Sequence, residues 1–326
     1  MTRDLPAYAQ VRAVDFSGIP VVDVQGFSDP AAIGAALVDA ATTTGFFYIS
    51  GHDVPADLTQ GAFAAAKAFF ARPEAQKASV AVDQNHRGWM AQGMTRLEGS
   101  KTFDAKEVFF WGRDIAPDDP DIGQPLVAGN QWPETVDPGL RQGIAPYYAA
   151  VVDLGRNLMS ALALGLGKPA DFFTAAYDKP LARGQLVYYP RMDQAALDAG
   201  RFGAAEHTDF GALTILKQDD VGGLQVKNRA GDWIAAPPIP DTFVCNIGDL
   251  LERWTNGRLI STPHRVLNTA GVDRFSIPIF FDPASGALID PSDFAAPNEA
   301  LLHPPVTAGA HIAGRNRKNF SQYSKP

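Results

Sequence analysis

Apolar residues recur at helical spacing in the first half of the chain and form short strand-like runs in the second half. Asp29-Pro30 and Asp137-Pro138 each predict a helix start, because aspartate accepts hydrogen bonds from free backbone N–H groups and proline fits the first turn. A further helix is predicted from about residue 56 to 71. The helix after Pro138 has the clearest apolar stripe, made of Leu140, Ile144, Tyr147, Val151, Leu154, Leu158 and Leu162. Such a stripe indicates a helix that packs on a hydrophobic core.

Short strands are expected to dominate after about residue 181, separated by turns at the spacing of a sandwich or jelly roll. The predicted strands are 185–189, 213–218, 223–226, 233–236, 242–247, 265–267 and 274–281. In the first third of the chain, strands are predicted near 19–22 and 46–49. The irregular stretch 80–137 contains one clear predicted strand, 107–111. A single turn of helix is expected at 249–254, and the tail from about 305 to 314 is also predicted as helical. The pattern favours a β-rich α+β fold, with helices from both ends wrapped around the strands.

Composition and charge limit the function classes. The chain has 326 residues, of which 46% are hydrophobic and 20% charged, and this excludes a disordered or fibrous protein. With 28 Lys and Arg against 36 Asp and Glu, the net charge is −8, which disfavours nucleic acid and anionic membranes as partners. No apolar run is long enough to span a bilayer, and the first residues lack a secretion signal pattern. The single cysteine, Cys245, cannot form an internal disulfide. We therefore expect a soluble, cytoplasmic protein, as a monomer or a small homo-oligomer.

Histidines are the main candidates for chemistry. The chain lacks a GxSxG nucleophile turn, a GxxxxGK phosphate loop and a GxGxxG loop after a strand. His207 and Asp209 stand two apart, and in an extended segment such residues point to one face. His264 is the candidate third ligand from a distant strand. Two imidazoles and one carboxylate are typical of non-haem Fe(II) oxygenases, because they leave coordination positions open. The alternative is that His207 caps a strand and His264 is a core histidine.

Arg274 and Ser276 form a second pair, two apart on a strand that is expected to be buried because Ile277, Ile279 and Phe281 follow. A buried arginine needs a partner, and its planar guanidinium matches a carboxylate. This pair is therefore a candidate site for one end of a small dicarboxylic acid whose other end chelates iron. The alternative is a surface arginine on an alternating strand.

Several motifs stand in a fixed order along nearly the whole chain. They occupy 19–23, 45–52, 188–190, 207–209, 221–226, 246–250, 254–257, 261–266 and 274–276. This ordered combination resembles the Fe(II)/2-oxoglutarate-dependent dioxygenases of the isopenicillin N synthase-like family. The combination is much more specific than any one of its motifs.

The resemblance implies a fold and a reaction. The fold is a double-stranded β-helix of jelly-roll type with N-terminal, central and C-terminal helices, in one oxygenase domain over 1–326. Its expected parts are about 1–180 wrapping the core, about 181–285 as the jelly-roll core with the iron site, and about 286–326 as a C-terminal cap. His207, Asp209 and His264 would bind Fe(II). The reaction consumes O2 and 2-oxoglutarate, with ascorbate as a candidate reductant, and hydroxylates or desaturates a small organic substrate while releasing succinate and CO2.

The resemblance also implies that Arg274 and Ser276 hold the distal carboxylate of 2-oxoglutarate and that Tyr189 hydrogen-bonds this cosubstrate. Val187 departs from the family pattern, because many members have asparagine before Tyr-Tyr-Pro and valine cannot hydrogen-bond. This departure leaves open an oxidase that does not use 2-oxoglutarate, similar to isopenicillin N synthase or ACC oxidase. A non-catalytic jelly-roll ligand-binding protein is the alternative from another class.

The substrate pocket is less defined than the iron site. By position, the 80–111 segment and the C-terminal tail are expected to cover the open iron positions. Aromatic residues there would supply apolar walls, and arginine would orient a substrate carboxylate. The candidates are Arg87, Trp89, Arg96, Phe110 and Trp111. His52 is interpreted as structural, since the three iron ligands are already assigned, and neither His86 nor His303 is expected to be a catalytic base.

Overall fold

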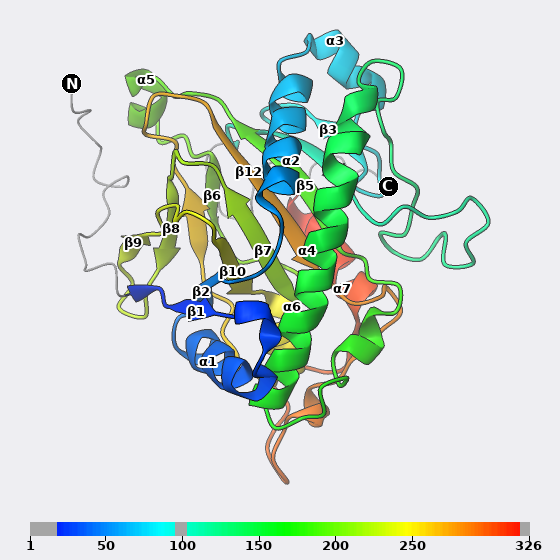
Figure 1. The fold of residues 1–326 in the computed structure, drawn as a ribbon, viewed down its shortest axis with the longest axis vertical. Coiled ribbons are helices and arrows are strands. Elements are labelled where there is room, and N and C mark those ends of the chain that lie inside the picture. The colour runs from blue at the N-terminus through cyan, green and yellow to red at the C-terminus, as the bar shows by residue number, and fades with distance from the viewer. Residues whose placement is uncertain (1–17, 95–102, 320–326) are drawn as a thin grey trace.

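The computed structural model describes residues 18–94 and 103–319, and two β-sheets form its centre (Figure 1). The larger sheet has the strand order β1-β2-β10-β7-β12-β5-β4-β3, and the smaller has the order β6-β11-β8-β9. The strands of the larger sheet are β1 (Val21–Asp23), β2 (Phe46–Ser50), β3 (Gly88–Met90), β4 (Glu107–Trp111), β5 (Arg183–Tyr189), β7 (Leu213–Gln218), β10 (Phe243–Ile247) and β12 (Arg274–Phe281). Those of the smaller sheet are β6 (Ala204–His207), β8 (Leu224–Lys227), β9 (Trp233–Ala235) and β11 (His264–Val266). A separate pair joins β13 (Leu288–Ile289) and β14 (Val306–Thr307).

The inner faces of the two sheets line one common cavity. Its walls come from β2, β5, β7, β10 and β12 of the larger sheet and from β6, β8 and β11 of the smaller. Successive side chains of a strand point to opposite faces. In β5, Gln185, Val187 and Tyr189 therefore face this cavity, while Leu186 belongs to the core on the other side. The strands thus form the jelly-roll arrangement that their spacing predicts.

Helices cover the outer face of the larger sheet, where α4 runs alongside α1 and α2 (Figure 1). All seven residues of the predicted α4 stripe are buried, so the predicted core-facing helix is confirmed. The helices are α1 (Pro30–Thr43), α2 (Ala56–Phe70), α3 (Glu74–Lys77), α4 (Pro138–Gly165), α5 (Gln194–Asp198), α6 (Asp249–Trp254) and α7 (Ala308–Asn319). Within the described ranges, none of them has the length and apolarity needed to cross a membrane.

Both aspartate–proline pairs stand at helix starts, but the two carboxylates have different partners. Asp29 Oδ1 accepts a hydrogen bond from the Ala32 N–H at 3.1 Å, which is the predicted cap. Asp137 makes no such bond at the start of α4. Its Oδ2 instead accepts from Arg72 Nε at 2.8 Å, just beyond the end of α2. Asp137 therefore ties the end of α2 to the start of α4.

The strand predictions agree best where β-branched and aromatic residues are dense. β4, β7 and β12 have the predicted bounds, and α6 is confirmed at 249–254. The predicted strand 265–267 begins one residue earlier, which places His264 in β11. The sequence pattern missed β6, because Ala-Ala-Glu-His lacks the residue types that favour strands. The predicted tail helix is displaced toward the C-terminus and is α7.

Gly34 in α1 and Gly165 at the end of α4 allow these two helices to touch through their backbones. A Cβ atom at Gly34 would overlap the carbonyl oxygen of Ala161 and lie 2.8 Å from the backbone nitrogen of Gly165. Gly34→Ala is therefore expected to lower the free energy of unfolding by about 1–3 kcal/mol, as overpacking of a close contact does. Denaturant unfolding measures this difference.

Gly61→Ala is the matched control for that substitution. Gly61 lies inside α2, and none of the described atoms beyond its neighbours comes within 4 Å of a Cβ built there. Replacing glycine by alanine inside a helix without a clash raises stability by up to about 1 kcal/mol. A Gly34→Ala variant as stable as Gly61→Ala would contradict the backbone contact between α1 and α4.

Candidate metal centre and adjoining cavities

Two strands of the smaller sheet bring the three predicted metal ligands together. His207 ends β6, His264 begins β11, and the two residues are direct partners in this antiparallel pair. Asp209 stands two residues beyond β6. Asp209 Oδ1 lies 3.9 Å from His207 Nε2 and 3.7 Å from His264 Nε2. One ligand atom from each of the three residues lies within 4.8 Å of the others, which is compatible with a single ion.

Backbone carbonyl groups determine which nitrogen of each imidazole faces the centre. His207 Nδ1 lies 2.7 Å from the Ala205 carbonyl oxygen, and His264 Nδ1 lies 3.2 Å from that of Thr262. A carbonyl oxygen can only accept, so Nδ1 carries the hydrogen and Nε2 presents its lone pair. Burial and then the neighbouring His264 lower the pKa of His207 to about 3. The imidazole is therefore neutral near pH 7, which is the form that binds a metal ion.

Hydrogen bonds from the larger sheet orient the carboxylate of Asp209. Its Oδ2 accepts from Thr214 Oγ1 of β7 at 2.5 Å and from Asn246 Nδ2 of β10 at 2.7 Å. Burial alone would raise the pKa of Asp209, but the two histidines and these two hydrogen bonds lower it below its ordinary value. The carboxylate is thus ionised, with Oδ2 held by protein groups and Oδ1 toward the imidazoles.

Asn246→Ala removes one of the donors that hold Asp209. We expect the variant to bind Fe(II) about 10- to 100-fold more weakly, as loss of a partner behind a metal ligand typically does. An anaerobic Fe(II) titration measures the change. Asn130→Ala is the matched control, because that amide bonds Asp114 and the Gly112 backbone away from the triad. Equal Fe(II) affinity in the two variants would contradict the role of Asn246.

Arg274 and Ser276 lie on the inner face of β12, in the cavity that also contains the triad. Arg274 is only 1% exposed; its Nε donates to the Gly222 carbonyl at 2.5 Å and its Nη2 to Gln218 Oε1 at 3.1 Å. Its Nη1 is buried and has no acceptor among the described residues. A buried N–H without an acceptor costs free energy, so this guanidinium fits an anionic ligand that enters the cavity.

The wall beside Arg274 is β5. Arg274 is in register with Tyr189, and Ser276 is in register with Val187. The Arg274 Cζ atom lies 4.7 Å from the centre of the Tyr189 ring, which packs the guanidinium against an aromatic face. Val187 also lines the cavity, so the departure from the family pattern falls on the cavity wall itself.

Lys106 and Gln185 line both this cavity and a second one beside it, although the sequence pattern does not point to them. Lys106 Nζ pairs with Asp104 Oδ2 at 3.0 Å, and Asp104 Oδ1 accepts from the Ala205 N–H. Burial alone would lower the pKa of Lys106, but Asp104 raises it above its ordinary value. Lys106 stands two residues before the inward-facing Val108, but the sequence does not show which face of this strand is inward, because both faces are buried.

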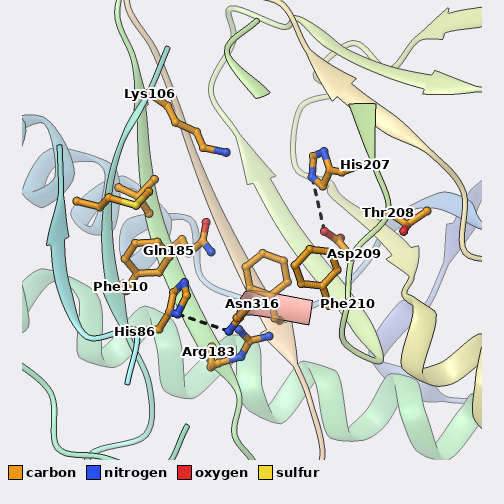
Figure 2. A pocket seen from close by; sticks show the side chains of 13 residues that line it. His86, Lys106, Phe110, Arg183, Gln185, His207, Thr208, Asp209, Phe210 and Asn316 are labelled. Atoms are coloured by element: carbon orange, nitrogen blue, oxygen red, sulfur yellow. Dashed lines mark hydrogen bonds and ion pairs between the residues drawn. The ribbon is translucent and has the colours of Figure 1, made fainter. Parts of the chain in front are cut away.

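The second cavity adjoins the first and shares with it Lys106, Gln185, His207, Asp209 and Phe280; its lining side chains are drawn in Figure 2. In that view, His207 and Asp209 form one side, while Lys106, Gln185, Phe110 and the cluster of His86, Arg183 and Asn316 lie across from them. Its lining is His86, Met90, Lys106, Val108, Phe110, Arg183, Gln185, His207, Thr208, Asp209, Phe210, Phe280 and Asn316. The cavity therefore combines apolar walls with a few polar groups, as substrate sites commonly do.

The five predicted substrate contacts are placed differently. Phe110 lines the second cavity. Trp89 and Trp111 point to the opposite face of their strands and belong to the core under the outer helices. Arg87 donates from Nη1 to two carbonyls of its own turn and from Nη2 to the distant Leu126 carbonyl, so it ties that turn to the segment at Leu126. Arg96 lies outside the described residues.

The other histidines stand apart from the triad. His52 Nδ1 accepts from the Val54 N–H at 3.1 Å, and its ring packs edge-on against Phe243, in agreement with a structural role. His86 lines the second cavity, and His303 is exposed.

Comparison with known proteins finds relatives of the same kind over most of the chain. A family model described as the N-terminal region of the non-haem dioxygenase in morphine synthesis matches residues 19–135, and one for the 2OG-Fe(II) oxygenase superfamily matches residues 183–283. The chain is 35% identical over 320 residues to the 2-oxoglutarate-dependent dioxygenase caaD of Aspergillus niger, with 94% of each chain covered.

Solved structures agree with these sequence relatives. A full-length Neurospora crassa protein in complex with alpha-KG, which is 2-oxoglutarate, has a TM-score of 0.82 at 29% identity and covers 93% of this chain and 97% of its own. JOX2 in complex with 2OG, Fe and JA has a TM-score of 0.79 at 27% identity and covers 99% and 94%. The expected double-stranded β-helix, the iron and the cosubstrate are thereby confirmed. The chain belongs to the 2OG-Fe(II) oxygenase superfamily and is a 2-oxoglutarate-dependent dioxygenase, an oxidoreductase.

Proposed function

We propose that this dioxygenase oxidises a small organic molecule in the cavity of Figure 2, with Fe(II) held by His207, Asp209 and His264. Arg274 and Ser276 hold the distal carboxylate of 2-oxoglutarate in the adjoining cavity, beside Tyr189. The observation that supports this best is the buried Nη1 of Arg274, which lies in the cavity of the triad without an acceptor among the described residues. Iron, when bound, supplies the redox chemistry that activates O2 as the 2-oxo acid is decarboxylated.

The residues of this chain bind and orient the reactants. Arg274, fixed by Gly222 and Gln218, presents a planar guanidinium that matches a carboxylate, so the dicarboxylic acid enters in one orientation. His207, Asp209 and His264 would supply three ligands to the iron, and the remaining coordination positions would be open to the cosubstrate and O2. Lys106 and Gln185 form the border between the two cavities. No side chain needs to act as a base, because the cofactor carries the oxidation chemistry.

The test is a screen of small organic molecules scored by succinate release with Fe(II), O2 and 2-oxoglutarate. The expected result is that at least one compound raises succinate formation and gains one oxygen or loses two hydrogens. Each hit is then incubated with Fe(II), ascorbate and O2 but without 2-oxoglutarate. Substrate oxidation without the 2-oxo acid would contradict the proposal and favour the oxidase alternative. Failure to bind Fe(II) anaerobically would favour the non-catalytic binding protein.

We further propose one oxygenase domain over residues 1–326, divided into the parts 1–180, 181–285 and 286–326. Strands β1 to β4 of the first part are hydrogen-bonded into the same sheet as β5, β7, β10 and β12, which supports a single domain. The net charge of −8 supports a small-molecule partner rather than nucleic acid. A cytoplasmic monomer or small homo-oligomer is the form proposed for the enzyme.

A further inference from the structure

The charged groups of the second cavity are unevenly distributed. Its charged lining residues are Lys106, Arg183 and Asp209, and Asp209 is a proposed iron ligand. Burial and then Arg183 hold the pKa of His86 well below its ordinary value, so this imidazole is neutral. Apart from the metal ligand, the described lining therefore offers a substrate two cations and no carboxylate.

Arg183 is held in place by a carboxylate that lies behind it. Asp282 Oδ2 accepts from Arg183 Nη2 at 2.8 Å and from Nε at 3.3 Å. Asp282 is 0% exposed, and its Oδ1 accepts from the Ala212 N–H at 2.8 Å, so the carboxylate itself is closed to a ligand. Neither of these two bonds uses Nη1, and a guanidinium has five N–H donors. Asp282 therefore fixes the orientation of Arg183, and the Nη1 group of Arg183 can still donate hydrogen bonds to a ligand in the cavity.

Two neutral polar side chains, His86 and Asn316, lie beside the Arg183 guanidinium, across the cavity from His207 and Asp209. Asn316 comes from α7, is 4% exposed, and its Nδ2 lies 3.5 Å from His86 Nδ1. Figure 2 shows Arg183 beside these two residues. The other walls of this cavity are apolar and consist of Met90, Val108, Phe110, Phe210 and Phe280.

We propose that the substrate is a small organic acid whose carboxylate binds Arg183 and whose apolar body lies against the aromatic walls next to the iron ligands. The inference rests on the proposed function, because it takes this cavity as the place of oxidation. Arginine suits the role, since its planar fork matches a carboxylate and a buried charge-assisted hydrogen bond is strong. Lys106 is not assigned to the substrate carboxylate. It also lines the cosubstrate cavity, so it lies at the end of the substrate cavity away from Arg183.

Matched acids and amides test this inference with probes of known structure. Butyrate and butyramide, and phenylacetate and phenylacetamide, differ within each pair mainly in charge. Each probe is titrated anaerobically into enzyme loaded with Fe(II) and 2-oxoglutarate, and binding is read from the visible absorption band of the loaded centre. In at least one pair the acid is expected to bind about 10- to 100-fold more tightly than the amide. Absence of acid preference in every pair overturns the inference.

Arg183→Gln is expected to remove the acid preference. Because this change leaves the buried Asp282 unpaired, the double variant Arg183→Gln/Asp282→Asn removes both charges and keeps an acceptor for the Ala212 N–H. It is expected to show the same loss, whereas Arg156→Gln, at an α4 arginine bonded to the Tyr177 carbonyl, is expected to keep the preference.

The remaining outcomes separate the two proposals. Loss of the acid preference in Lys106→Gln, with retention in both Arg183 variants, would overturn the assignment to Arg183. Wild-type enzyme that binds neither Fe(II) nor 2-oxoglutarate contradicts the proposed function. Wild-type enzyme that binds both but does not distinguish acids from amides contradicts the organic-acid substrate alone.

Discussion

His207→Ala is expected to abolish iron-dependent succinate formation. The substitution removes the Nε2 that faces Asp209 Oδ1, so that only two of the three proposed ligands, Asp209 and His264, remain. Loss of a group behind a metal ligand costs about 10- to 100-fold, so loss of a ligand itself is expected to cost more than about 100-fold. Succinate released from 2-oxoglutarate in the presence of Fe(II), O2 and an identified substrate measures the effect.

His303→Ala is the matched control for this prediction. His303 is exposed and does not line either cavity, so its variant should keep wild-type succinate formation. Denaturant unfolding of both variants separates loss of the metal site from loss of the fold. Full turnover by a folded His207→Ala enzyme would contradict the assignment of the metal ligands.

Arg274→Ala is expected to weaken 2-oxoglutarate binding much more than Fe(II) binding. Truncating one partner of a buried, hydrogen-bonded charge pair costs about 2–5 kcal/mol, which corresponds to an affinity loss of about 30-fold or more. Anaerobic titration of the Fe(II)-loaded enzyme with 2-oxoglutarate gives the dissociation constant. Arg274→Lys keeps the charge without the planar fork and should lie between wild type and Arg274→Ala.

A shorter 2-oxo acid makes the Arg274 prediction specific to one end of the cosubstrate. 2-Oxobutyrate has the chelating end of 2-oxoglutarate but lacks the distal carboxylate. If Arg274 binds that carboxylate, wild type and Arg274→Ala should bind 2-oxobutyrate with similar affinity. An equal loss of affinity for both 2-oxo acids would indicate a general disturbance of the cavity, and unchanged affinity for 2-oxoglutarate would refute the carboxylate role.

The convergence of the triad and of the Arg274 pair on one cavity could be predicted, because residues two apart on a strand point to the same face. His207 and Asp209 stand two apart, as do Arg274 and Ser276, and the structure places all four on the walls of one cavity. The positions of β7, β12 and α4 were equally accessible, because dense β-branched residues or a regular apolar stripe indicate these elements. In β7, β12 and α4, the secondary structure that the local sequence favours is also the one that the packing of the core requires.

The sequence could not show which β4 side chains line the proposed substrate cavity, because both faces of β4 are buried. Phe109 and Trp111 enter the core beneath the helices, while Val108 and Phe110 belong to the core on the inner side of the sheet. Hydrophobicity marks the buried face of a strand only when the other face meets water. Here the inner face is defined by the pairing of β4 with β5, which is a long-range contact. Arg183 was missed because the predicted strand began at Gln185, whereas β5 begins at Arg183.

The hydrogen bonds around Asp209 have a consequence for how iron and the fold depend on each other. Two of the proposed iron ligands belong to the smaller sheet, while the carboxylate of the third is held by Thr214 and Asn246 of the larger sheet. A bound ion would therefore link the two sheets, because its ligands are held by both of them. By thermodynamic linkage, an ion at a concentration about 100 times its dissociation constant adds about 2.7 kcal/mol to the stability of the native state. The supply of iron would then change the fraction of folded enzyme as well as its turnover.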